Sequence, residues 1–393
     1  MRNNRYNRII YFIVLCILSI FLILKMQRGF SGSAQQGGLW NYIQLFFVFT
    51  GLLVLFSKEN SYKLIPYIKV YIGLSFSMWL LSLFPFMYRT NIGVSQCFQI
   101  LTVPYGVCVL LTMFYVGRRN EITSFPIVIS LTYLVIFFIL FNALRSYRFL
   151  ITDEKGAIAD VYYIVGLLPL LLVYLPKRWQ IVPIIMALVA VMMTGKRAGF
   201  IMLTGILFIN YFVGGNFREK QRKSLFQSVA ILAIVSVIVY FVMMNLTETF
   251  QLDMFDRLER LSEDGGSGRA DRWEHILKLM WASNGTQLMF GHGFGATVTN
   301  IGGHAHNDFL ELLYDYGVFI FALYAVMFIL LLAEGIKMYK KKYPYFKEFM
   351  CSVIVALCLA MFSFYNVDIT HITCCSVCQG LFLADWTKYR EKK

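Results

Sequence analysis

Long apolar runs, each separated from the next by a short polar stretch, recur along most of the chain. A helix that crosses the hydrocarbon core of a bilayer, roughly 30 Å thick, needs about 20 mostly apolar residues. About twelve segments meet this criterion, near residues 9–24, 41–56, 65–84, 98–116, 124–144, 157–175, 180–195, 197–213, 225–244, 309–333, 348–365 and 370–386. The pattern predicts an all-α polytopic membrane protein with about twelve transmembrane helices.

One connection is much longer than the others and divides the chain. Residues 245–307 are predicted to form a large loop that carries short helices. Within it, the helical spacing of Trp273, Ile276, Leu277 and Met280 predicts an amphipathic helix, which we expect to lie on the surface of the leaflet. The predicted units are helices 1–9 over residues 1–244, the loop over 245–307, and helices 10–12 with a C-terminal tail over 308–393.

Composition agrees with the apolar pattern, and the distribution of charge adds an orientation. The chain is 58% hydrophobic and 15% charged, with a mean hydropathy of +0.63, whereas soluble domains have about 25% charged residues. The net charge is +14, and the basic residues gather at the N-terminus, in alternate connections and in the C-terminal tail. Cytoplasmic segments carry such an excess. We therefore expect cytoplasmic termini, an extracytoplasmic loop and no nucleic-acid partner.

Eight cysteines occur, most of them inside apolar runs, so no disulfide framework is expected. His371, Cys374, Cys375 and Cys378 are spaced to share one helical face. They form either a metal or redox site or a small-residue packing face. Four ligands on one rigid helix cannot surround a tetrahedral metal without a partner, which favours packing.

A basic turn, from Thr194 to Gly199, joins two short apolar runs. The preceding run, residues 181–193, reaches only about 20 Å as a helix at 1.5 Å per residue. Lys196 and Arg197 are therefore expected slightly below the outer membrane–water boundary, where a cation is costly unless it meets an anion or a wet cavity. The alternative is that both side chains snorkel to the lipid headgroups.

A second polar cluster, with two histidines, precedes the apolar run near residue 309. Asn307 and Asp308 are favoured N-cap types and place a helix start there. The positive end of a helix disfavours an imidazolium, so we expect a neutral His306 unless Asp308 or Glu311 offsets that effect. These two carboxylates are available to orient its ring through the second nitrogen. Histidines that merely cap the helix are one alternative. A divalent-cation site is another, with ligands His292, His304, His306, Asp308 and Glu311.

The order of these motifs resembles the bacterial O-antigen polymerases and O-antigen ligases. The resemblance rests on a basic turn, a G-R-x-x-x-W segment, a glycine turn and an H-N-x-x-L segment followed by glycine. They lie at Thr194–Gly199, Gly268–Trp273, Gly291–Gly295, and His306–Asn307 with Leu310 and Gly317. It implies glycan transfer from undecaprenyl-diphosphate-linked sugars at the outer face of the bacterial inner membrane, and it does not separate polymerase from ligase. The leading interpretation is polymerisation of the lipid-linked repeat units into O-antigen, capsule or exopolysaccharide.

The resemblance implies a glycosyltransferase that needs neither metal nor cofactor. The leaving group is a lipid diphosphate, and Arg binds phosphate in a planar, bidentate manner. We expect Arg197 and Arg269 to serve this role in catalysis, with Lys196 and Arg272 as further binding residues. A neutral His306 is the expected base for the acceptor hydroxyl. The other substrate-binding candidates are His304, Asn307, Asp308 and Glu311.

Two other functions remain open. The nearest is an O-antigen ligase or protein O-oligosaccharyltransferase, which moves glycan to a lipid A core or to protein. The other is a transporter or flippase of lipid-linked glycan, for which charges near the midplane of internal repeats are typical. The expected partners are the lipid-linked donor and acceptor and the bilayer, with a chain-length regulator and a flippase as further candidates.

Overall fold

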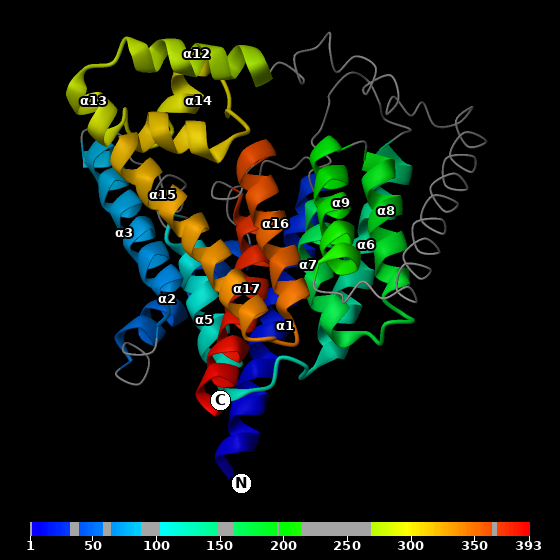
Figure 1. The fold of residues 1–393 in the computed structure, drawn as a ribbon. Coiled ribbons are helices and arrows are strands. Elements are labelled where there is room, and N and C mark those ends of the chain that lie inside the picture. The colour runs from blue at the N-terminus through cyan, green and yellow to red at the C-terminus, as the bar shows by residue number, and fades with distance from the viewer. Residues whose placement is uncertain are drawn as a thin grey trace.

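All regular secondary structure in the part of the chain that the structure, a computed structural model, describes is helical. The described residues are 2–31, 39–57, 64–87, 103–147, 161–194, 196–213, 269–363 and 368–393, and they contain no strand. A bundle of long helices carries a layer of three short helices, α12–α14, across one end, and both termini lie at the other end (Figure 1). The all-α prediction is confirmed for these residues.

Eleven of the predicted apolar segments coincide with described helices of the bundle. These are α1 (Arg2–Ser31), α2 (Leu39–Phe56), α3 (Pro66–Met87), α5 (Tyr105–Arg119), α6 (Pro126–Tyr147), α7 (Val161–Tyr174), α8 (Ile181–Thr194), α9 (Arg197–Phe212), α15 (Asp308–Lys340), α16 (Phe346–Phe362) and α17 (Ile369–Lys392). The twelfth, 225–244, and the first part of the predicted loop, 245–268, lie outside the described residues.

Two described helices are by themselves long and apolar enough to cross a membrane, Tyr6–Met26 and Asp308–Lys340. Other apolar helices are shorter, at 10–17 residues. The helical character of the bundle is thus established over the described chain, while the crossing of a bilayer by about twelve helices stays a prediction.

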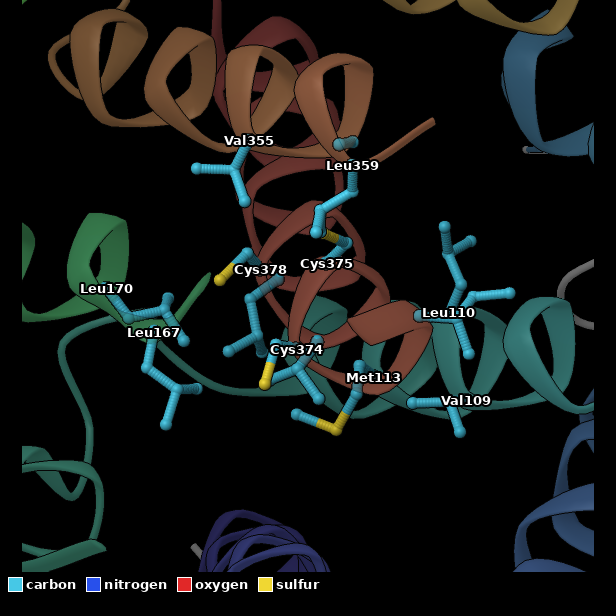
Figure 2. Close-up of a cluster of buried hydrophobic side chains, with 14 of the residues drawn as sticks. Val109, Leu110, Met113, Leu167, Leu170, Val355, Leu359, Cys374, Cys375 and Cys378 are labelled. Atoms are coloured by element: carbon cyan, nitrogen blue, oxygen red, sulfur yellow. The ribbon is translucent and has the colours of Figure 1, made fainter. Parts of the chain in front are cut away.

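Helix α17 packs among α5, α7 and α16, and its cysteines serve that packing. Figure 2 shows the three thiols among apolar side chains of the neighbouring helices, namely Val109, Leu110, Met113, Leu167, Leu170, Val355 and Leu359. The Sγ of Cys378 lies 3.3 Å from the carbonyl oxygen of Gly166. A Cβ on Gly166 would meet the Cβ of Cys374 at 2.9 Å. The contacts favour the packing interpretation over a metal or redox site.

Helix α15 is bent at Gly317, where the backbone has φ 80° and ψ −179°. The bend occurs where the end of α13 (Gly285–Phe290) meets the helix. A Cβ on Gly317 would lie 2.4 Å from the carbonyl oxygen of Met289, and one on Gly291 would lie 2.2 Å from that of Asp315. At both positions, the absence of a Cβ lets two backbones touch. Both glycines also have a positive φ, which residues with a side chain rarely adopt. This contact joins the layer to the bundle.

Gly317→Ala is expected to separate α13 from α15. Its backbone region is almost exclusive to glycine and costs about 1–3 kcal/mol for other residues, and the new Cβ would overlap a carbonyl as well. Limited proteolysis between α13 and α14 (Ala296–Ile301) should accelerate roughly 10- to 100-fold. Gly302→Ala is the control, because Gly302 also has a positive φ, 74°, but open space around it. Equal proteolysis of both variants would show that the backbone contact does not hold the layer.

Candidate functional site

The short segment from His304 to Asn307 is held from two sides. Helix α12 (Arg269–Trp281) lies over it. Arg272 Nη1 donates to the carbonyl of His304 at 3.1 Å, and Trp273 Nε1 donates to that of Ala305 at 2.8 Å. Each hydrogen bond joins residues 32 positions apart in the sequence. Helix α12 therefore positions the His304–Asn307 segment through contacts that are not local in sequence. The Trp of the G-R-x-x-x-W motif, Trp273, is thus the residue that donates to Ala305.

Glu311, in the first turn of α15, holds the same segment from below. Its Oε1 accepts from Nδ1 of His304 at 2.7 Å, and its Oε2 accepts from the backbone N–H of Ala305 at 3.0 Å. The expectation that Glu311 orients His306 is therefore wrong, because it orients His304. This hydrogen bond, opposed in part by burial, raises the pKa of His304 above its usual 6.5.

Asn307 and Asp308 begin α15, as the sequence predicts. Asn307 Oδ1 accepts from the backbone N–H of Leu310 at 3.2 Å, which is the contact of an N-cap. Asp308 is fully buried, and its Oδ2 accepts from Tyr324 Oη at 2.9 Å. One of its oxygens therefore faces the bundle, where it ties the first turn of α15 to a position sixteen residues further along.

His306 has a left-handed backbone conformation, with φ 54°, which is uncommon for residues other than glycine. Its ring is half-buried, and burial is the largest cause that lowers its pKa to about 4. The charges of Arg269, Arg272, His304 and Lys196 lower it further. His306 is therefore neutral near pH 7, as predicted, although burial and nearby cations supply the cause rather than the helix end. Three segments of the chain therefore act on His306 electrostatically: the start of α12, the neighbouring His304, and Lys196 at the start of α9.

Arg269 and Arg272 stand three residues apart at the start of α12 and have different contacts. Arg269 Nη1 donates to the carbonyl of Phe362 at 2.8 Å and so joins α12 to the end of α16. Arg272 is engaged with His304. Of the apolar residues at helical spacing on α12, Ile276 is buried and Leu277 is exposed. Beneath α12 lie α14 and the start of α15 (Figure 1).

The basic turn between α8 and α9 lies at the same end of the bundle as the layer (Figure 1). Thr194 ends α8, and its buried hydroxyl donates back to the carbonyl of Ala190 at 2.9 Å. Lys196 is the N-cap of α9, and Arg197 is its first residue. Lys196 acts on the pKa of His306. The side chain of Arg197 lies outside what the structure describes.

The glycine turn contacts Asp315 and Tyr314, to which the sequence analysis assigned no role. Both oxygens of Asp315 accept hydrogen bonds, Oδ1 from the N–H and hydroxyl of Thr297 at 2.7 and 2.6 Å and Oδ2 from the N–H of Gly295 at 3.2 Å. His292 stacks on Tyr314 with ring centroids 4.2 Å apart. No local pattern in the sequence links Asp315 to Gly295 and Thr297, so this contact could not be predicted.

Both ring nitrogens of His292 have partners within the layer. Nε2 lies 3.0 Å from Ser283 Oγ, and Nδ1 lies 3.1 Å from the carbonyl of Tyr314. This residue therefore has a structural role. The alternative cation site loses one of its five candidate ligands, and Glu311 is already shared between His304 and Ala305.

The combined contribution of the two histidines to stability should be greatest near pH 6.5, because their pKa shifts act in opposite directions. The raised pKa of His304 contributes stability below pH 6.5 that is lost as the pH rises through the folded-state value. The lowered pKa of His306 contributes stability above pH 6.5 that is lost as the pH falls toward about 4. Melting temperatures across this range measure both effects. Glu311→Gln should flatten the alkaline side alone, and an unchanged alkaline slope would contradict the His304–Glu311 contact.

Comparison with known proteins bears on this part of the chain. Residues 182–325 match the family described as O-antigen ligase, a stretch that runs from α8 to the middle of α15. No curated protein matches the chain. The family's members are membrane proteins with glycosyltransferase-like activity. The match covers less than half of the chain but includes every candidate site residue, and it confirms the resemblance to the O-antigen polymerases and ligases.

Proposed function

We propose that the protein polymerises undecaprenyl-diphosphate-linked oligosaccharide repeat units into a surface polysaccharide. The observation that carries this proposal is a neutral, half-buried His306 under the influence of Lys196, Arg269 and Arg272. A neutral imidazole can accept a proton, and clustered cations can hold a diphosphate. Donor, acceptor and lipid would meet at the outer face of the bacterial inner membrane, with both termini in the cytoplasm.

In the proposed reaction, a hydroxyl of the acceptor sugar attacks the anomeric carbon of the donor. A glycosidic C–O bond forms while the bond from that carbon to the diphosphate oxygen breaks. The hydroxyl proton passes to His306, and undecaprenyl diphosphate leaves with the bonding electrons. Because diphosphate is a stable anion, its departure needs cations rather than a general acid, and Arg269, Arg197 and Lys196 would supply them.

Donor binding would also activate the base. In the free protein, the cations beside His306 help to lower its pKa to about 4, and so weak a base is a poor proton acceptor at pH 7. A bound diphosphate would neutralise Arg269, Arg272 and Lys196 and remove that effect. The pKa of His306 would then rise when the donor is present, toward the range in which general bases work best.

Transfer is expected to continue in excess EDTA. Arginine and lysine side chains suffice to balance the diphosphate charge in the proposed reaction, so chelation should leave the rate of chain extension unchanged. The measurement is extension of a lipid-linked repeat unit by purified protein with and without EDTA. Loss of extension that added Mg²⁺ or Mn²⁺ restores would instead assign the histidine and carboxylate cluster to a metal.

The polymerase and ligase functions differ in the acceptor. We favour the polymerase, and the test is expression in a bacterial strain that makes the same repeat unit but lacks its polymerase. Restored long chains are expected from a polymerase. Single repeat units transferred to lipid A core or to protein would instead identify a ligase. A flippase would yield neither long chains nor transferred repeat units, because it forms no glycosidic bond.

A further inference from the structure

Helix α13 exposes an apolar surface at the edge of the layer. Leu288, Met289 and Phe290 are 36%, 50% and 55% exposed. The sequence around them is unusual for a surface, because no Asp, Glu, Lys or Arg occurs between Lys278 and Asp308. Helix α12, by contrast, exposes an ion pair between Lys278 and Glu274 at 2.7 Å. The layer therefore has a charged region on α12 and an uncharged apolar region on α13.

The apolar region of α13 continues directly onto α15. The carbonyl of Met289 lies against Gly317, where an added Cβ would be 2.4 Å away. The next two residues of α15, Val318 and Phe319, are 44% and 51% exposed. An exposed apolar surface thus passes from α13 to a helix that is long and apolar enough to cross a membrane. Figure 1 shows α13 at the corresponding corner, beside the upper ends of α3 and α15.

The length of α15 sets the depth of this contact. Lys337 and Lys340 lie in its last turn, at the end of the bundle that carries the termini (Figure 1). From Gly317 to Lys337 the helix rises roughly 30 Å at 1.5 Å per residue, which equals the thickness of the hydrocarbon core, about 30 Å. Because α15 is inclined within the bundle (Figure 1), lysines at one boundary place Gly317 at the other boundary or just inside it. The end of α13 lies at that same level.

We propose that the end of α13 inserts into the outer leaflet, with Leu288, Met289 and Phe290 among the upper parts of the acyl chains. Lipid fits this surface better than a partner protein, because the surface is uncharged and continuous with the lipid-facing side of α15. Insertion of α13 would fix the height of the layer above the bilayer, and with it the height of His306. This goes beyond the proposed glycan transfer and does not depend on it.

A fluorescent amino acid, encoded in place of Phe290 in the full-length protein, tests this insertion. The protein is placed in phosphatidylcholine nanodiscs, and two quenchers are compared: a nitroxide near the headgroup end of the lipid chain, and aqueous iodide. Phe319 is the lipid-facing reference, and Glu274 is the aqueous reference. Met289 gives a second position on α13 should the probe at 290 disturb folding.

We expect the probe at 290 to match the one at 319, with at least threefold stronger quenching by the nitroxide lipid and weaker quenching by iodide than at 274. Quenching by iodide at 290 and 289 as strong as at 274 would overturn the insertion. Iodide quenching at 319 would also overturn it, because α15 would then not carry lipid at that level. None of these outcomes depends on whether the protein transfers glycan.

Discussion

His306→Ala is expected to bind the lipid-diphosphate donor almost normally and to fail at glycan transfer. The substitution removes the proposed base but leaves Arg269, Arg272 and Lys196 to hold the diphosphate. Loss of a general base typically lowers the rate by about 10²–10⁴-fold. Donor affinity and the rate of chain extension, measured side by side, separate the two effects. Thermal stability of the variant, compared with wild type, checks whether the change at this positive-φ position disturbs the fold.

Two further histidine variants control this result. His275 is exposed on the same helix as the arginines, and His275→Ala should extend chains at the wild-type rate. His304→Gln removes the partner of Glu311 and should reduce extension less than His306→Ala, since it disturbs only the position of the segment. Extension by His306→Ala at the wild-type rate would refute the base assignment and make His304 the candidate.

Arg269→Lys is expected to weaken donor binding by roughly 10- to 150-fold. This range corresponds to the loss of one charge-assisted contact of about 1.5–3 kcal/mol. The variant keeps the positive charge but loses the planar fork that matches a diphosphate. Lys at 269 also cannot reproduce the geometry of the hydrogen bond to Phe362. Binding of a lipid-diphosphate glycan measures the effect.

The matched control is Arg178→Lys, since Arg178 is exposed between α7 and α8, at the other end of α8 from the basic turn. It should bind and extend normally. Thermal stability of Arg269→Lys, compared with wild type, separates a loss of donor contact from a loss of the link between α12 and α16. Normal donor binding by Arg269→Lys would place the diphosphate elsewhere, with Arg197 as the next candidate.

Features set by local chemistry were predictable from the sequence. The start of α15 was predicted from the capping preference of Asn307. The long helices were predicted from apolar runs of about the length that a bilayer requires. The neutral state of His306 was also predicted, although for a different reason. Helix ends act over one turn, whereas burial and the charges of Arg269, Arg272 and Lys196 depend on contacts between distant parts of the chain.

Contacts between distant segments were not predictable in the same way. Glu311 has two histidines within reach along the chain, and spacing alone does not decide between them. The choice of His304 depends on Arg272 and Trp273, which fix the segment from 32 residues away. The bend at Gly317 likewise depends on the approach of Met289. A single glycine in an apolar run does not predict which other backbone segment will contact it.

The most direct test of the proposed function is the stoichiometry of transfer by purified protein in liposomes that contain the undecaprenyl-diphosphate-linked repeat unit. Glycan length and free undecaprenyl diphosphate are measured together over time. We predict one undecaprenyl diphosphate released for each glycosidic bond formed by wild type, and neither product from His306→Ala. Movement of the donor across the bilayer without release of undecaprenyl diphosphate would contradict glycan transfer and favour a transporter.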